Sequence, residues 1–140
     1  LAARLAPLRD RGVMILGSGN VVHNLRRLQW DQPILAYDWA ERFDDAVVEQ
    51  LERDPQDILK VEEHPDYRSA VPTPDHFVPL LYLAGLAAEE GVAARTILRG
   101  HAMGSVSMTC YGLGAQEILS RQPASAATLP GGVPPDQTNM

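Results

Sequence analysis

Hydrophobic positions in the first part of the chain change from helical to extended spacing. Leu1, Leu5 and Leu8 recur at helical intervals, and Gly12 follows them as a typical helix stop. Residues 13–16 are all apolar, which is the pattern of a short strand buried on both faces. The sequence therefore predicts the end of a helix and then a buried strand, as if the chain were a fragment of a longer protein.

Three helical patterns occupy the middle of the chain. The first starts at Asp38, whose side chain can cap a helix, and Glu41 completes the spacing of a capping box. A shorter helix is expected to open at Pro55, because proline suits the first turn of a helix. The third pattern covers residues 74–90, a strongly apolar run that stops at Gly91.

Two apolar stretches near the C-terminal end, residues 93–99 and 105–111, have the pattern of strands. We therefore predict an α/β fold, a partial domain in which a central sheet is flanked by helices. The folded part is expected to span residues 1–114. Residues 115–140 are rich in Pro, Ala, Gly and Ser, so we expect a disordered tail there.

Composition narrows the kind of protein and its partners. The chain has 140 residues, of which 45% are hydrophobic and 21% charged, as in ordinary globular proteins. A net charge of −6 and the lack of a large basic cluster argue against nucleic acid or an anionic membrane as a partner. The single cysteine, Cys110, suits a reducing compartment, and no apolar run is long enough to span a bilayer. We therefore expect a cytoplasmic protein.

Two of the four histidines are the candidate chemical groups. His76 lies within residues 72–82, where Thr73 is expected to cap the following helix and place His76 in its first turn. The positive end of a buried helix favours neutral imidazole, the form that binds metals or acts as a base. His23 follows a Gly-Ser-Gly-Asn turn at residues 17–20, where the backbone must bend or approach another segment closely.

Each of these histidines also has a plainer interpretation. His76 fits a solvent-exposed residue, with Asp75 simply complementing the helix dipole. His23 fits a core or surface histidine, and Asn24 fits a turn residue as well as one that orients a ring or binds a substrate. Two histidines also fall short of the three protein ligands that non-haem iron and catalytic zinc sites use. The residues alone therefore predict half of a metal site.

The glycines at residues 17–19 invite comparison with a dinucleotide-binding fingerprint. That fingerprint needs a third glycine where this chain has His23, because helix and strand must pack closely there. A nucleotide-binding module is therefore not expected.

Two blocks of sequence, in this order and at this separation, resemble a known family. They are Gly-Ser-Gly-Asn-Val-Val-His-Asn-Leu at residues 17–25 and Pro-Thr-Pro-Asp-His-Phe-Val-Pro-Leu-Leu-Tyr at residues 72–82. They resemble the C-terminal half of class III extradiol ring-cleaving dioxygenases of the LigB superfamily, in the DOPA 4,5-dioxygenase-like branch. The resemblance implies an oxidoreductase that opens a small aromatic diol, a catechol or DOPA-like molecule, with O₂. It also implies a mononuclear non-haem site for Fe(II) or Zn(II).

The resemblance also assigns roles to individual residues. His23 matches the family's histidine after the glycine turn, which acts as a metal ligand or as the acid/base group. His76 matches the later histidine at the metal site, and Asp75 retains a carboxylate where relatives often have glutamate. Asn24 and Asp75 are the weaker candidates for substrate binding.

The family's first two metal-binding histidines come from an N-terminal half that this chain does not contain. The chain is therefore expected to be part of the enzyme, with a non-catalytic metal-binding remnant or one subunit of a split enzyme as the alternatives. A sheet edge left open by a missing half could also pair with another chain, so a homo-oligomer stays open.

Overall fold

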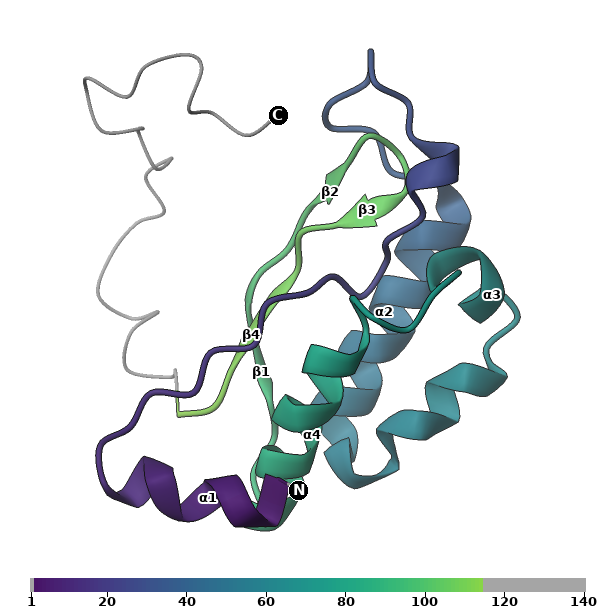
Figure 1. The fold of residues 1–140 in the computed structure, drawn as a ribbon. Coiled ribbons are helices and arrows are strands. Elements are labelled where there is room, and N and C mark those ends of the chain that lie inside the picture. Colours follow the sequence, from purple (N-terminus) through teal and green to yellow (C-terminus); the bar gives the residue numbers. More distant parts are fainter. Residues whose placement is uncertain (1, 115–140) are drawn as a thin grey trace, which may run out of the picture.

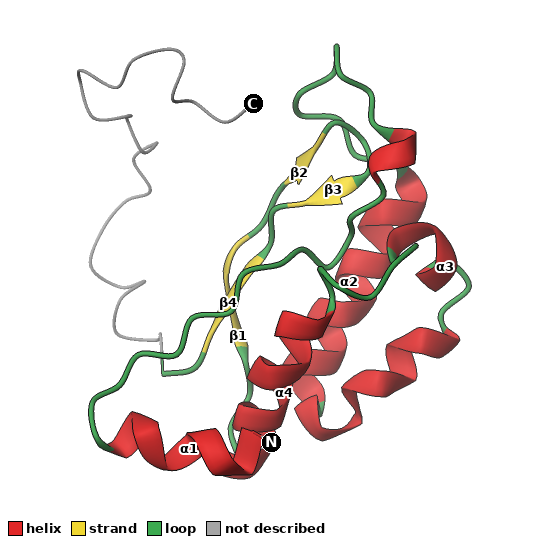
Figure 2. Ribbon diagram, viewed as in Figure 1, coloured by secondary structure: helices red, strands yellow, loops and turns green. Residues whose placement is uncertain are grey.

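The computed structural model of the chain describes residues 2–114, and the predicted tail at 115–140 lies outside this range. All the helical elements come first along the described part and the four short strands follow them, and the mixed class with helices and small sheets is confirmed (Figures 1 and 2). The helical elements are α1 (Ala2–Asp10), α2 (Asp38–Arg53), α3 (Tyr67–Ala70), α4 (Val78–Glu90) and the 3-10 helices η1 (Leu25–Arg27) and η2 (Pro55–Glu63). The strands are β1 (Arg95–Leu98), β2 (His101–Ala102), β3 (Val106–Ser107) and β4 (Cys110–Gly112).

The strands form two small antiparallel sheets rather than one continuous ladder. In one sheet β1 pairs with β4, and in the other β2 pairs with β3. In Figure 1 these strands lie beside the layer formed by α2, α3 and α4, while α1 crosses at one end of the molecule. The predicted strand at 93–99 is present as β1, and the one at 105–111 is divided into β3 and β4. Strand β2 lies in the segment 100–104 that was expected only to join them.

Helix α2 supplies the centre of the hydrophobic core. Phe43, Val47 and Leu51 recur at helical spacing, and all three are fully buried. They pack with Ala84 and Ala87 of α4 in one apolar cluster. The helix is 16 residues long, and its buried stripe explains why it forms where the sequence predicts.

An ion pair between a buried carboxylate and a partly exposed arginine ties α2 to the strands. Asp44 is fully buried, and its Oδ2 accepts hydrogen bonds from Arg99 Nη2 and Thr109 Oγ1, both at 2.8 Å. Arg99 follows β1 directly, and Thr109 precedes β4. A buried carboxylate is strongly destabilising unless it is paired. This cluster therefore fixes the helical layer against the strands.

The expected capping box at the start of α2 is wrong. Tyr37 is the N-cap residue, and no side chain bonds to the free amides of the first turn. Asp38 is instead the first helical residue, with Glu41 in the first turn. Carboxylates in this position still favour the helix, because they complement its dipole.

The expected start of α4 at Pro74 is also wrong, and the helix begins at Val78. The carbonyl of Pro74 accepts hydrogen bonds from the amides of Phe77 (2.9 Å) and Val78 (2.8 Å), which closes a turn before the helix. His76 therefore lies in this turn and not in the first turn of the helix. The predicted stop at Gly91 is confirmed, since Gly91 has a φ of 65° at the C-cap.

Residues 13–16 do not form the buried strand that the sequence predicts. Met14 is 85% exposed and Leu16 is 83% exposed. These residues have no regular secondary structure, and no backbone hydrogen bond joins them to a strand within residues 2–114. A strand is stable only when a neighbour satisfies its backbone groups, and the described residues provide none here.

No helix within residues 2–114 combines the length and apolar character needed to cross a membrane.

Candidate functional site

Residues 22–24 lie along β3 and fix the position of His23. The backbone of His23 pairs with Val106 in an antiparallel bridge, and its amide donates to the carbonyl of Ala70 at 2.9 Å. The amide of Val22 donates to Ser107 Oγ at 3.0 Å, and the amide of Ser107 donates to the carbonyl of Val22 at 3.0 Å. His23 is therefore held on both sides by backbone hydrogen bonds.

Asn24 joins three elements at the next position. It is 7% exposed, its Nδ2 donates to the carbonyl of Ser69 at 2.7 Å, and its Oδ1 accepts from the amide of Arg26 at 3.2 Å. Its backbone carbonyl accepts from Ser105 Oγ at 2.7 Å. The side-chain amide of Asn24 thus holds the backbone around His23 in place. The sequence alone indicated only that Asn24 could be a turn residue or orient a ring.

Gly19 brings the turn before α4 against the segment before His23. The amide of Asn20 donates to the carbonyl of His76 at 3.0 Å. A Cβ atom at Gly19 would lie 2.2 Å from that carbonyl oxygen and 3.0 Å from Pro79 Cγ. Only glycine permits this approach without movement of the backbone. The predicted close approach at residues 17–20 is therefore present, although these residues do not form a turn.

The imidazole rings of His23 and His76 are stacked. Their centroids lie 3.5 Å apart and their planes differ by 14°, although the two residues are 53 positions apart in the sequence. The His76 side chain is 40% exposed, and Asp75 Oδ2 lies 3.6 Å from His76 Nε2. The structure therefore brings together three of the predicted site residues, with one face open to solvent.

The surroundings of His23 favour its neutral form. Burial lowers the pKa of His23, a charge on His76 lowers it further, and Asp75 opposes both effects. The pKa of Asp75 is also lowered, first by a hydrogen bond from the Thr73 hydroxyl. Thr73 therefore serves the carboxylate and not the helix start. Near neutral pH the site presents a neutral imidazole at His23 beside an ionised carboxylate.

This donor set fits part of a metal site. Neutral imidazole and carboxylate are suitable ligands for iron or zinc, but catalytic sites use about three protein ligands. Within residues 2–114 no cluster of three or more His, Cys, Asp or Glu side chains could hold a metal ion. Imidazole lone pairs lie in the ring plane, so two nearly parallel rings do not point at one common ion. The described residues therefore offer donors but not a complete ligand set.

Several supporting residues were not found from the sequence. Ser105 and Ser107 are almost fully buried and bond the backbone beside His23, yet in sequence they look like ordinary small strand residues. The contributions of Ser69 and Ala70 come from their backbone carbonyls, and such contacts cannot be predicted from the residue type. Among the supporting residues, only the glycines at 17 and 19 were indicated by the sequence, because glycine often occurs where two segments approach closely.

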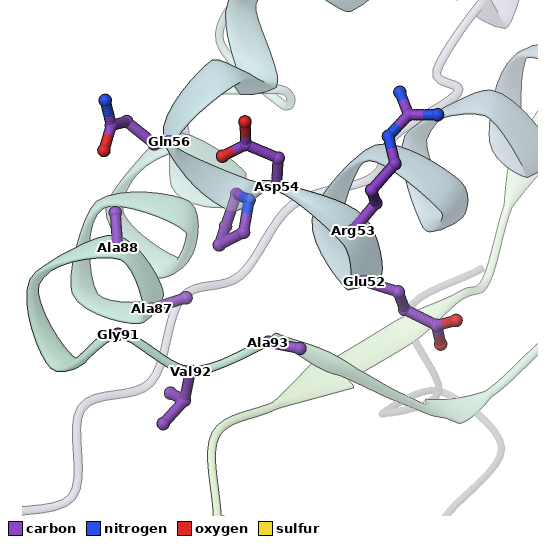
Figure 3. Close-up of a pocket in the computed structure, with 10 residues that line it drawn as sticks. Glu52, Arg53, Asp54, Gln56, Ala87, Ala88, Gly91, Val92 and Ala93 are labelled. Carbon is purple, nitrogen blue, oxygen red and sulfur yellow. The ribbon is translucent and has the colours of Figure 1, made fainter.

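A separate hollow of about 250 Å³ lies where the C-terminal ends of α2 and α4 meet the start of η2 (Figure 3). Its lining contains no histidine. In Figure 3 the side chains of Glu52, Arg53 and Gln56 point in different directions and do not converge on one position. Small-molecule sites need a few convergent polar groups, so the histidine pair is the better candidate.

Comparisons with known sequences all point to one group of proteins. Residues 2–114 match the family model described as the catalytic LigB subunit of aromatic ring-opening dioxygenase. The chain is 39% identical over 121 residues to a 4,5-DOPA dioxygenase extradiol of Escherichia coli K12, covering 81% of this chain and 43% of that protein. It is 35% identical over 95 residues to a 4,5-DOPA dioxygenase extradiol of Beta vulgaris, covering 66% of this chain and 35% of that protein.

A solved structure gives the same result for the fold. The crystal structure of an uncharacterized protein from Escherichia coli K12 matches with a TM-score of 0.67 and 36% sequence identity. The match covers 77% of this chain and 46% of that one. The chain thus spans less than half the length of the relatives that it matches.

The glycine contact gives a test of how the rings are held together. We predict that Gly19→Ala lowers the free energy of unfolding by about 2 kcal/mol, because the new methyl group overlaps the His76 carbonyl. Gly17→Ala is the matched control, since its Cβ would meet Pro79 at an ordinary 3.4 Å and should cost less than about 1 kcal/mol. Urea unfolding measures both values, and equal effects of the two substitutions would contradict the assigned contact.

A second test concerns the charges around His23. Substitutions at His76 and Asp75 should shift the pKa of His23 in opposite directions. His76→Gln should raise the pKa of His23 toward its ordinary 6.5, because it removes a repelling charge and part of the burial. Asp75→Asn should lower it further, because it removes an attracting charge. Imidazole NMR titration follows both shifts, and movement in the same direction would refute this electrostatic picture.

The lowered pKa of His23 also determines how the free energy of unfolding changes with pH. As pH falls below 6.5, the unfolded chain takes up a proton at His23 before the folded chain does. The free energy of unfolding should therefore fall as pH drops through the folded-state pKa, and His23→Gln should remove this part of the loss.

Proposed function

The chain belongs to the LigB family of aromatic ring-opening dioxygenases, and from this premise we propose that it carries the C-terminal part of an extradiol active site. The observation that carries the proposal is the stacked pair of His23 and His76, at a centroid distance of 3.5 Å. The proposed reaction is ring opening of a small aromatic diol by O₂. The names of two relatives point to 4,5-extradiol cleavage of DOPA or a similar catechol.

We propose different roles for the two rings. His76 is assigned as a metal ligand, because it lies in a turn at the exposed side of the site beside an ionised carboxylate. His23 is assigned as the proton-transfer group, because its ring is nearly parallel to that of His76 and so is not aimed at the same ion. Its lowered pKa supports this role, since a general base must be unprotonated near neutral pH.

Asn24 and Asp75 differ in how well the geometry suits substrate binding. The Asp75 side chain is 65% exposed beside His76, so it can reach a polar group of a bound diol. The amide of Asn24 is buried and engaged by two backbone groups. Substrate contact stays a prediction for both residues. The geometry favours direct substrate contact by Asp75, and it favours Asn24 as a residue that positions His23.

The metal of this family, Fe(II) or Zn(II) by resemblance, is proposed to be held by His76 together with ligands from outside the described residues. Bound at that position, it would orient the two hydroxyls of the diol and stabilise charge that develops there. The residues of this chain would hold one ligand in place, keep a base next to it and close one side of the site.

Two other functions are consistent with the same observations. A non-catalytic remnant would keep the stacked rings without any turnover. One subunit of a split enzyme would become active only when a second chain supplies the remaining ligands. The incomplete donor set within residues 2–114 favours the need for a second part, and the activity of the completed protein separates these functions.

The test uses a chimera in which the part of the Escherichia coli relative outside the matched region is joined to this chain. We expect the chimera to open the ring of L-DOPA in the presence of Fe(II), and His23→Ala and His76→Ala each to reduce turnover at least about 1,000-fold. The absorbance change that accompanies ring opening measures the rate.

His64→Gln is the control substitution in this experiment. His64 lies outside the site, with its ring 5.6 Å from that of Phe43, and glutamine can still accept the hydrogen bond from the amide of Asp66. It should leave turnover within about twofold. Turnover near the unsubstituted rate in both His23→Ala and His76→Ala would rule out the assignment, and no turnover at all would favour the remnant.

A further inference from the structure

A second hollow, of about 470 Å³, opens beside the short helix η1. Its volume is within the range of small-molecule sites. Unlike the hollow of Figure 3, it is lined by two cationic side chains and by no acidic one. We call it the arginine hollow, and its lining residues are Arg26, Arg27, Leu28, Gln29, Tyr37 and Trp39.

The two arginines of this hollow have no counter-ion among the described residues. Neither Arg26 nor Arg27 lies within ion-pair distance of a carboxylate of residues 2–114, although the whole chain has a net charge of −6. Two neighbouring guanidinium groups favour an anion, and their fixed N–H donors match the two oxygens of a carboxylate. The charge of the hollow therefore suits an anionic group of a ligand.

Two aromatic rings form the apolar wall of the arginine hollow. The guanidinium carbon of Arg27 lies 5.8 Å from the centre of the Trp39 ring, which is a cation–π contact. Trp39 stacks on Tyr37, with ring centroids 5.8 Å apart, and both rings pack against the hydrophobic core. A ring face does not take the place of a carboxylate, so the N–H groups of Arg27 remain available to a ligand.

Contacts with the turn between β2 and β3 hold the walls in place. The amide of Gln29 donates to the carbonyl of Met103, and the amide of Tyr37 donates to the carbonyl of Gly104, both at 2.9 Å. The Tyr37 hydroxyl donates to Gln29 Oε1 at 2.8 Å, which leaves the side-chain nitrogen of Gln29 as a further donor. A ligand that enters a wall already held in this way has less conformational entropy to overcome.

The arginine hollow begins three residues after His23. Asn24 lies between them, and its Oδ1 accepts from the amide of Arg26 at 3.2 Å. A chain of three residues spans at most about 11 Å, so the Cα atoms of His23 and Arg26 are no farther apart than this. The hollow is therefore close enough to receive a short side chain of a diol bound at the histidine pair.

We propose that the arginine hollow binds a carboxylate at the end of the substrate's side chain, and that Arg26 and Arg27 select acidic diols over neutral ones. The ring of the diol would lie at His23 and His76, and its side chain would run along η1 to the two guanidinium groups. The link to a substrate rests on the proposed function, whereas the affinity of the hollow for a carboxylate does not.

The first experiment measures binding to the 140-residue chain without any turnover. Hydrocinnamate has the carboxylate and a ring but lacks the two hydroxyls of a diol. In NMR titrations we expect it to cause saturable shifts of the Arg26 and Arg27 side-chain Nε resonances, and we expect none from the neutral hydrocinnamamide. Equal shifts with the two compounds, or no saturable shift with either, would overturn the site.

A double substitution and a matched control test the arginines themselves. Arg26→Gln combined with Arg27→Gln should weaken hydrocinnamate binding at least about tenfold, because it removes both charged donors. Arg95→Gln is the control, since Arg95 is exposed in β1, has no ion pair within residues 2–114 and lies outside the hollow. All three side chains are exposed, so both variants should melt at the temperature of the unsubstituted chain.

The second experiment measures selection between two diols in the chimera described above. Dihydrocaffeate and 4-propylcatechol have side chains of equal length, and only the first carries a carboxylate. The ratio of their kcat/KM values should favour dihydrocaffeate at least about tenfold, and the double arginine substitution should lower this ratio at least about fivefold. A purely structural role would slow both diols equally, and an unchanged ratio would overturn the selection by arginine.

The two experiments distinguish this proposal from the proposed function. Carboxylate binding to the chain without turnover of either diol by the chimera would overturn the proposed function and the link to a substrate, and would keep the carboxylate site. Inorganic phosphate that binds as tightly as hydrocinnamate would identify a general anion site and overturn the assignment to a substrate side chain.

Discussion

The arrangement of the site depends on one backbone contact, the approach of Gly19 to the carbonyl of His76. A Cβ at Gly19 would lie 2.2 Å from that oxygen, and the neighbouring amide of Asn20 bonds to it at 3.0 Å. This contact sets the turn before α4 against the segment that carries His23. The two rings stack as a consequence, because β3 and the Ala70 carbonyl already hold His23 from the other side. The chemistry therefore rests on a glycine that makes no polar side-chain contact of its own.

Much of the helical layer could be predicted from sequence, because its signals are local. The spacing of Phe43, Val47 and Leu51 predicted α2, and Gly91 predicted the end of α4. The start of α4 was missed because the prolines at 74 and 79 both fit a first helical turn, and only the tertiary structure selects between them. His23 and His76 were identified as candidates, and their stacking distance could not be predicted, since it arises from contacts distant in sequence.

Residues 13–16 show the opposite case, in which the local signal is strong but its structural condition is absent. The apolar run indicates a buried strand, yet Met14 and Leu16 are exposed because no described strand pairs with them. The donor set at His23 and His76 is short of a full metal site within the same residues. Residues 13–16 and His23 lie on one continuous segment, and the chain spans less than half the length of these relatives.

Metal titration followed by imidazole NMR tests most directly whether His23 and His76 belong to one divided site. Zn(II), which is redox-inert, would be added to the chain alone and to the chimera. The account predicts weak, non-saturating changes in the chain alone. In the chimera it predicts saturation at one ion per molecule, with a large shift of the His76 nitrogen resonances and a smaller one for His23. Saturation at one ion in the chimera with both histidine spectra unchanged would contradict it.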